Sequence, residues 1–355
     1  MIEKESIVQL RDDYFGPFLP YIQDEDITDV DYNGAELWTK HLDGTKVKQE
    51  DEITDLFIEQ FSNRIANKVS KPFNQQNKVL EANTESLRIS ILHESATTSG
   101  RSICIRKSPP KLRFTIKEAI ENGYCSRQVM CMLINCILAR MNIVICGEMG
   151  SGKTECARFL AQFIPDGDRV ITIEDSPEWH YKQINPNHDC VEIRVNEQFT
   201  YSDALKASLR QDAVWVLLTE SRSTEVKELF EDISSGSNII TTLHTDDVRR
   251  IPDRMLNMTG SRLDADRLIN NVYDGIDVGI KMDWKNGKRY IEQICFFNRD
   301  NERNMVYMMV ADGRLLDVDL PLDIMRKFKK VTADLFECEI VRKELQEDEE
   351  IQLKA

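Results

Sequence analysis

Residues 146–155 read CGEMGSGKTE, and the expected architecture of the chain is built around them. They match the pattern GxxxxGK followed by Ser or Thr, in which glycines let backbone N–H groups surround nucleotide phosphates. The apolar segment NIVIC precedes the pattern and a helical segment follows it, which is the strand–loop–helix context that phosphate binding requires. The residues predicted to contact phosphate are Gly147, Gly150, Ser151, Gly152, Lys153, Thr154 and Glu155, with Thr154 also expected to ligate Mg²⁺.

Short apolar strands alternate with helical patterns after this loop. RVITIED, VWVLLTE and NIITTL have the composition of buried strands, and YSDALKASLR and TEVKELFEDI have helical periodicity. Such alternation favours an α/β fold with a mostly parallel sheet. Beyond about residue 248 the sequence predicts helices and then a hairpin that turns at Asn286-Gly287.

The stretch SPPK is the clearest linker signal, because two consecutive prolines disrupt both helix and sheet. Before it, DLFIEQFSNRIANKV predicts an amphipathic helix, and SLRISIL and SICIRK predict strands, which together suggest a small α+β domain. The expected division is an N-terminal α+β domain over 1–107, a linker and first helix over 108–126, a main domain over 127–345 and a solvated acidic tail over 346–355.

Composition limits the possible functions. The 355 residues carry a net charge of −15, which argues against a protein that holds bare nucleic acid through a basic surface. No signal peptide and no run of about 20 apolar residues is visible, so no membrane span is expected. Nine cysteines occur without any CxxC pair, which argues against a zinc ribbon and is typical of free thiols in a reducing compartment.

Polar residues follow several of the predicted strands. VITIED ends at Glu174-Asp175, VWVLLTE ends at Glu220, and His244 follows NIITTL. Since ligands bind at the carboxyl ends of strands in an open parallel sheet, these residues are candidates to orient water, hold a metal and contact the γ-phosphate. Either acid alone could equally be an ordinary surface carboxylate, and a single histidine is most often structural.

Together these segments resemble the secretion traffic ATPases of type II and type IV secretion, type IV pili and conjugation. ITIEDSPEW resembles the aspartate box of that family, LRQDAVWVLLTESRSTEV its Walker B segment and TTLHTDD its histidine box. The tetracysteine zinc insert of the larger enzymes is missing, so the chain is most similar to the compact branch. The resemblance implies a RecA-like P-loop NTPase domain with a smaller α+β N-terminal domain.

The resemblance also implies roles for individual residues. Glu174 matches the acid commonly assigned as general base, with Glu178 following it, and Glu220 matches the Walker B glutamate that helps to hold Mg²⁺. Arg222, Glu225 and His244 stand where the family has its own arginine, glutamate and histidine. Arginines of the N-terminal domain reach the nucleotide in this family, and the candidates are Arg88, Arg101 and Arg106, which could equally be arginines on a strand face.

Some positions depart from the family pattern. Ala213-Val214 replaces Pro-Asp before the Walker B strand, Thr219 replaces the glycine before the glutamate, and Ser237 replaces a histidine. These changes leave Lys153 and both key glutamates in place. They are compatible with slow hydrolysis or with a specialised member.

The resemblance implies a hexameric enzyme with ATP and Mg²⁺ as ligands, which converts hydrolysis into mechanical work. The expected partner is a membrane-embedded platform protein, and the expected location is the cytoplasmic face of the membrane, without a membrane span and without a nucleic-acid partner. Two alternatives stay open: a RecA-like nucleic-acid translocase, and a nucleotide-binding scaffold with weak hydrolysis.

Overall fold

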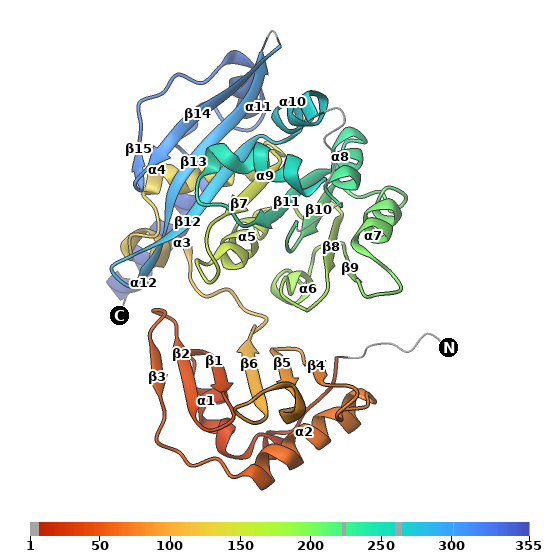
Figure 1. Ribbon diagram of the computed structural model, residues 1–355. Helices are drawn as coiled ribbons and strands as arrows, with labels where there is room; N and C mark the ends of the chain where they lie inside the picture. The colour runs from red at the N-terminus through yellow and green to blue at the C-terminus, as the bar shows by residue number, and fades with distance from the viewer. Residues whose placement is uncertain (1–6, 222–224, 260–264, 301, 355) are drawn as a thin grey trace. The chain divides into compact units, whose positions relative to one another are not determined.

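The computed structural model describes residues 7–221, 225–259, 265–300 and 302–354, and the side chains of 347–354 are left out (Figure 1). The chain separates into two compact units, residues up to Pro110 and residues from Lys111 onward. Arg222, one of the predicted catalytic residues, lies outside the described residues.

The smaller unit is an antiparallel sheet in the order β3-β2-β1-β6-β5-β4 with helices against it. Its strands are β1 (Ile27–Tyr32), β2 (Leu37–His41), β3 (Lys46–Lys48), β4 (Val79–Asn83), β5 (Leu87–Leu92) and β6 (Ser102–Lys107). Its helices are α1 (Leu19–Gln23) and α2 (Asp55–Val69), with 3₁₀ turns at Asp12–Tyr14, Gly16–Phe18 and Glu94–Ala96. Alternate strand residues such as Ile89 and Ile105 join Phe61 and Ile65 of α2 in one apolar core, as strand and helix periodicity require.

Helix α2 has the bounds of the predicted amphipathic helix. The Thr54 hydroxyl accepts a hydrogen bond from the Phe57 N–H at its start, and Ser70 ends it in a left-handed conformation with φ 54°. Strands β5 and β6 were also predicted, whereas β1 to β4 lie in segments whose polar composition gave no strand signal.

The larger unit contains a sheet in the order β15-β14-β13-β12-β7-β11-β10-β8-β9, which is parallel from β12 to β9 and antiparallel from β12 to β15. The parallel strands are β7 (Ile143–Cys146), β8 (Val170–Glu174), β9 (Cys190–Arg194), β10 (Trp215–Leu218), β11 (Asn238–Leu243) and β12 (Val278–Lys285). The others are β13 (Lys288–Asp300), β14 (Arg303–Ala311) and β15 (Arg314–Leu315).

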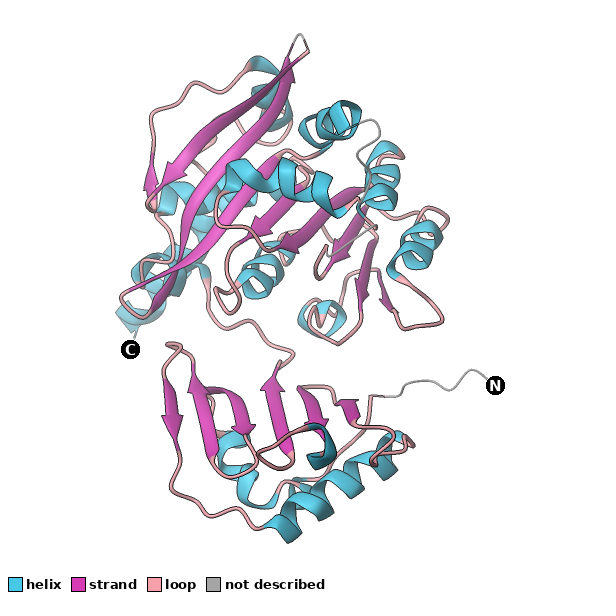
Figure 2. Ribbon diagram, in the orientation of Figure 1, coloured by secondary structure: helices cyan, strands magenta, loops and turns pink. Residues whose placement is uncertain are grey.

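Helices cover both faces of this sheet (Figure 2). They are α3 (Ile116–Glu121), α4 (Arg127–Leu138), α5 (Lys153–Ala161), α6 (Tyr181–Ile184), α7 (Tyr201–Ser208), α8 (Val226–Ser234), α9 (Ile251–Met258), α10 (Ala265–Gly275), α11 (Leu322–Phe328) and α12 (Glu339–Lys354), with a 3₁₀ turn at Val248–Arg250. Along β7, Ile143 and Ile145 enter the apolar cluster that includes α4 and α5, while Val144 and Cys146 enter the cluster that includes α8 and α9. The strand is therefore buried on both faces, as a parallel strand should be.

Two expectations for the C-terminal part have different outcomes. The hairpin is confirmed: Asn286 and Gly287 have φ of 53° and 75° and connect β12 to β13. Over the segment expected as a solvated tail, residues 346–355, helix α12 continues as far as Lys354. Within the described residues, no helix has the length and apolar character needed to cross a membrane.

Candidate active site

The phosphate loop, residues 147–154, joins β7 to α5 and depends on glycine. Gly147, Gly150 and Gly152 have φ of 142°, 81° and 97°, a backbone region that side-chain-bearing residues rarely adopt. A side chain at Gly147 would also collide with the Met282 carbonyl of β12. Helix α5 begins at Lys153, so the loop ends where free N–H groups of a helix terminus can face an anion.

The Lys153 ammonium is buried at the centre of the site. Its Nζ donates to the carbonyls of Gly147 (3.1 Å) and Glu148 (2.8 Å) and lies 3.3 Å from His244 Nδ1. Burial lowers the pKa of Lys153, and the nearby Glu220 carboxylate opposes that shift. The ammonium thus has only weak carbonyl and imidazole partners, which phosphate oxygens could replace.

His244 connects the lysine to the Walker B strand. Its Nε2 lies 3.1 Å from Glu220 Oε1, at the end of β10. Because Nδ1 faces an ammonium donor, it acts as the acceptor, and Nε2 carries the proton that faces Glu220. The sequence predicted that Lys153, Glu220 and His244 meet at one sheet edge, and the structure brings the three together.

The acidic box, residues 171–179, contains two glutamates in different surroundings. Glu174 ends β8, is buried, and its Oε2 accepts the N–H groups of Glu178 (2.7 Å) and Trp179 (2.9 Å). Burial raises the pKa of Glu174 to about 7, against the lowering effect of these two hydrogen bonds. Its carboxyl group therefore holds the turn that follows the strand.

Glu178, by contrast, faces the phosphate loop. The Thr154 hydroxyl donates to Glu178 Oε2 at 3.3 Å, and Glu178 is only partly buried. The sequence named Glu178 merely as the residue that follows Glu174 and did not include it among the site residues. Its signal was available, since it is the second acid of the same box, but spacing alone did not say which acid reaches the loop.

The oxygen donors at this point are suited to magnesium. Mg²⁺ prefers hard oxygen ligands and usually keeps waters and substrate phosphates in its shell, so it needs few protein ligands. The Thr154 hydroxyl offers one such oxygen, and the Glu178 carboxylate lies next to it. Among the residues that the structure describes, no group of three or more His, Cys, Asp or Glu side chains could by itself hold a metal ion.

Departures from the family pattern make their own contacts. The Thr219 hydroxyl donates to the Ile173 carbonyl (3.3 Å), while the Thr219 carbonyl accepts from the Thr242 hydroxyl (2.6 Å). The Ser237 hydroxyl donates to the Ala213 carbonyl at 2.9 Å. Thr219 is therefore bonded to both β8 and β11 immediately before Glu220.

Glu155 contacts the segment after the linker. One of its carboxylate oxygens accepts the Arg113 N–H at 2.9 Å, and the other lies 3.5 Å from a guanidinium nitrogen of Arg158. Arg158 in turn donates to the Lys111 carbonyl at 2.8 Å. Glu155 lies in the first turn of α5 but its side chain is directed to this segment.

The three predicted arginines of the smaller unit differ in their surroundings. The Arg101 side chain is 11% exposed, pairs with Glu94 at 2.7 Å and lies over the Phe73 ring. The Arg106 side chain is 52% exposed and donates to Asp29 at 2.8 Å. Arg106 lies opposite Arg88 in the sheet register. Arg101 is thus held by partners within its own unit, while Arg88 and Arg106 lie opposite each other on neighbouring strands.

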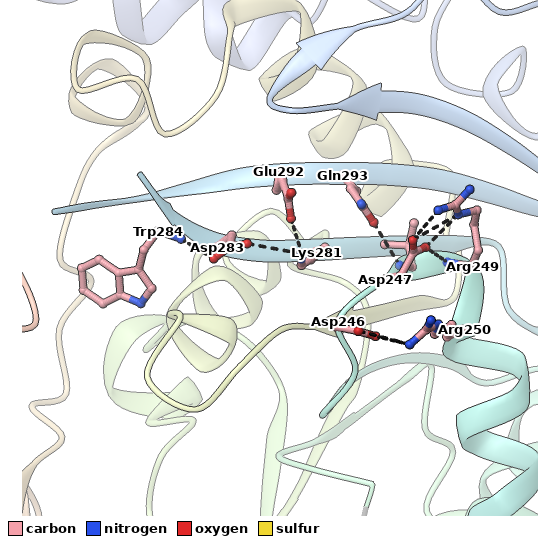
Figure 3. A network of polar contacts seen from close by, with 10 residues as sticks. Asp246, Asp247, Arg249, Arg250, Lys281, Asp283, Trp284, Glu292 and Gln293 are labelled. Atoms are coloured by element: carbon pink, nitrogen blue, oxygen red, sulfur yellow. Dashed lines mark hydrogen bonds and ion pairs between the residues drawn. The ribbon is translucent and has the colours of Figure 1, made fainter. Parts of the chain in front are cut away.

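An open cavity of about 500 Å³ lies beside the loop, lined by Gly147, Glu148, Met149, His244, Thr245 and Asp246. Figure 3 shows three groups of ion pairs on this side of the sheet: Lys281 contacts Asp283 and Glu292, Asp247 contacts Arg249, and Asp246 contacts Arg250. The Val248 N–H donates to Gln293 of β13 at 3.1 Å, so the segment after His244 is attached to the β12–β13 hairpin.

Comparisons with known proteins agree with this arrangement. A family model for type II/IV secretion system proteins matches residues 68–277. An uncharacterized protein of Bacillus anthracis is 30% identical over 66% of this chain and 53% of its own length. The type IV secretion system protein VirB11 of Bartonella quintana is 27% identical over 54% of this chain and 55% of its own length. The chain therefore spans about half the length of these curated relatives.

Solved structures share the fold. The Legionella pneumophila ATPase DotB matches with a TM-score of 0.57 and 16% identity, over 83% of each chain. The pilus retraction motor PilT with bound ADP matches with a TM-score of 0.58 and 15% identity, over 86% of this chain and 82% of that one. The predicted fold, a RecA-like P-loop domain with a smaller α+β N-terminal domain, is confirmed.

Proposed function

Because this chain belongs to the type II/IV secretion system protein family, we propose that it is an ATPase that hydrolyses Mg-ATP to drive a secretion, pilus-assembly or conjugation machine. One observation carries the proposal. The phosphate loop, the Thr154–Glu178 contact and the Lys153–His244–Glu220 contacts converge at one sheet edge. A loop that only binds nucleotide does not need carboxylates and a histidine around it.

In the proposed reaction, Lys153 leaves the carbonyls of its own loop and contacts the β- and γ-phosphates. Loop N–H groups and the start of α5 stabilise the remaining negative charge. Glu178 orients the attacking water and accepts its proton, since its carboxylate is the one that reaches the loop. His244 leaves Lys153 when the phosphates arrive and stays oriented by Glu220.

Magnesium, when bound, neutralises phosphate charge and orients the transferring group. Thr154 would hold it together with the substrate phosphates, and Glu220 would complete its shell. Glu174 has a positioning role in this proposal: its buried carboxyl group holds the turn that presents Glu178. In this proposal Glu178 has the role of base that the family resemblance gave to Glu174.

The mechanical part of the proposal comes from the family. The names of relatives and neighbours, a type IV secretion system protein and a pilus retraction motor, support an assembly that does work on other proteins. We propose a homo-hexamer that meets a membrane-embedded platform protein at the cytoplasmic face of the membrane. Arg88 and Arg106 are the arginines of the smaller unit that we propose for nucleotide contact.

Steady-state phosphate release tests the proposal. The wild-type chain with Mg-ATP is compared with Lys153→Ala and Glu178→Gln over a range of protein concentrations. We expect both variants to lose at least about 100-fold in turnover, and Glu178→Gln to keep nucleotide affinity. Glu197→Gln is the matched control, because it makes the same change at an exposed position. Turnover that rises more than proportionally with protein concentration supports assembly.

Two outcomes would point elsewhere. If the chain binds nucleotide but releases no phosphate, even when membranes with the platform protein are added, the nucleotide-binding scaffold is the better interpretation. Release that depends on added DNA would favour the translocase.

A further inference from the structure

The hairpin of β12 and β13 lies directly against the phosphate loop. Arg289 of β13 donates from Nε to the Gly150 carbonyl at 3.2 Å. Its Cδ lies 2.7 Å from the place that a Cβ would take at Gly152, and the Met282 carbonyl of β12 blocks a Cβ at Gly147. The loop therefore has glycine at both positions partly because this hairpin is packed on it.

The end of the hairpin carries a stacked pair of side chains. The Arg289 guanidinium lies 4.3 Å from the centre of the Trp284 ring, and the two residues are direct partners in the strand register. Trp284 is only partly buried, whereas Trp179 and Trp215 are core residues. In Figure 3, Trp284 projects from the end of the hairpin, while Lys281 contacts Asp283 and Glu292 along its length.

Sheet order puts this pair at the opposite side of the loop from the reactive groups. On one side of β7 lie β11, β10 and β8, after which come His244, Glu220 and Glu178. On the other side lie β12 and β13, which carry Trp284 and Arg289. A nucleotide whose γ-phosphate faces the carboxylates extends its ribose and base away from them. The hairpin side is where that end of the molecule arrives.

We propose that the Trp284–Arg289 pair is a stacking platform for the base of a nucleoside triphosphate. The inference rests on the proposed function, because the phosphates must occupy the loop for the base to reach the hairpin. Bases stack on aromatic rings and on guanidinium planes, and Trp284 holds the Arg289 plane in place. Such a platform contacts the face of a base and not its hydrogen-bonding edge. Purine nucleotides should therefore bind more tightly than pyrimidine nucleotides, with little discrimination between adenine and guanine.

The test compares a nucleotide with its phosphates alone. Calorimetry on the full chain measures affinity for the Mg²⁺ complexes of adenylyl imidodiphosphate and inorganic tripolyphosphate. Arg289→Lys keeps the charge and loses the plane, and Trp284→Leu removes the ring beneath it. We expect Trp284→Leu to lose roughly tenfold in nucleotide affinity, the amount that stacking of a base on an aromatic ring contributes, and to keep its tripolyphosphate affinity. Arg289 also bonds to Gly150 of the loop, so Arg289→Lys should weaken the binding of both ligands, with the larger loss for the nucleotide. Lys285→Gln, which removes a charge from an exposed position of the same hairpin, should change neither affinity.

Two other results would contradict the proposed stacking platform. Unchanged nucleotide affinity in Arg289→Lys and Trp284→Leu would show that the base lies elsewhere. An equal loss for nucleotide and tripolyphosphate would show that the pair only supports the loop. If the wild-type chain binds tripolyphosphate but the variants behave like wild type, the proposed function survives and only the platform fails. If the wild-type chain binds neither ligand, both fail together.

Discussion

Glu174 and Glu178 are four residues apart in one acidic box, yet their surroundings suit them to different roles. Glu174 is buried and its oxygen accepts two backbone N–H groups, while Glu178 faces the Thr154 hydroxyl. Sequence alone located the box and the sheet edge, because strand ends and acidic residues are local features. It could not separate the two acids, since the turn between them is fixed by hydrogen bonds that no residue pattern specifies.

The substitution Glu174→Gln tests the raised pKa of buried Glu174 through the pH dependence of stability. Glutamine keeps an acceptor oxygen for both N–H groups and carries no charge. Burial raises the pKa of Glu174 to about 7 from its ordinary 4.5, so the folded wild type holds its proton more tightly than the unfolded chain and loses stability as pH rises between these values. The free energy of unfolding of the variant, relative to wild type, should therefore rise by roughly 3 kcal/mol between pH 4 and pH 8. Urea unfolding at several pH values measures it.

The control for this experiment is Glu197→Gln, which changes an exposed glutamate. If the free energies of unfolding of Glu174→Gln and wild type differ by the same amount at every pH, the raised pKa of Glu174 is contradicted.

Among the elements, the phosphate-binding helix is tied to the segment that precedes α3. Phe114 packs on Phe159 of α5, with ring centres 4.8 Å apart, and on Tyr124 at 4.7 Å. Glu155 and Arg158 of the same helix hold the backbone of Arg113 and Lys111. The start of the larger unit is thus fixed to the helix whose N-terminus receives the phosphates.

Phe114→Ala should remove most of this attachment. The lost apolar contact predicts a fall of roughly 2 kcal/mol in the free energy of unfolding of the larger unit, together with faster proteolysis between residues 108 and 115. Phe199→Ala is the matched control, because Phe199 is 38% exposed. Equal effects of the two substitutions would mean that the Phe114 contacts contribute nothing.

The hairpin turn offers a second test at the level of elements. Gly287 has φ of 75° with open space around it, so Gly287→Ala meets only backbone strain and should cost about 1 kcal/mol. Gly167, also in open space, lies outside the left-handed region, and Gly167→Ala should be neutral or slightly stabilising. Chemical denaturation compares the two, and a neutral Gly287→Ala would contradict the turn geometry.

The burial of each strand decides whether the sequence alone predicts it. Strands β7, β8, β10 and β11 are buried on both faces and read as short apolar runs, and their helices have clear periodicity. Strands β1 and β9 contain charged residues between apolar ones. Each is held by pairing, β1 with β2 and β6, and β9 with β8. Their strand state depends on sheet pairing more than on local composition.

In the whole molecule, the two units have separate cores. The smaller unit is built around the apolar cluster between α2 and its sheet, and the larger unit around the two clusters on the faces of its own sheet. The phosphate loop, both glutamates of the acidic box and His244 all belong to the larger unit. The stability of the smaller unit and the binding of phosphates by the loop should therefore respond to different substitutions.

Thermal unfolding of the full chain should accordingly show two transitions that respond to different changes. Arg101→Gln removes the ion pair with Glu94 and the contact with Phe73, so it should lower the stability of the smaller unit by roughly 1–3 kcal/mol. Arg11→Gln, at an exposed ion pair of the same unit, should have little effect. A non-hydrolysable ATP analogue at 100 times its Kd should stabilise the larger unit by about 2.7 kcal/mol, and Lys153→Ala should abolish that gain. A single transition that moves with both Arg101→Gln and Lys153→Ala would show that the cores unfold as one.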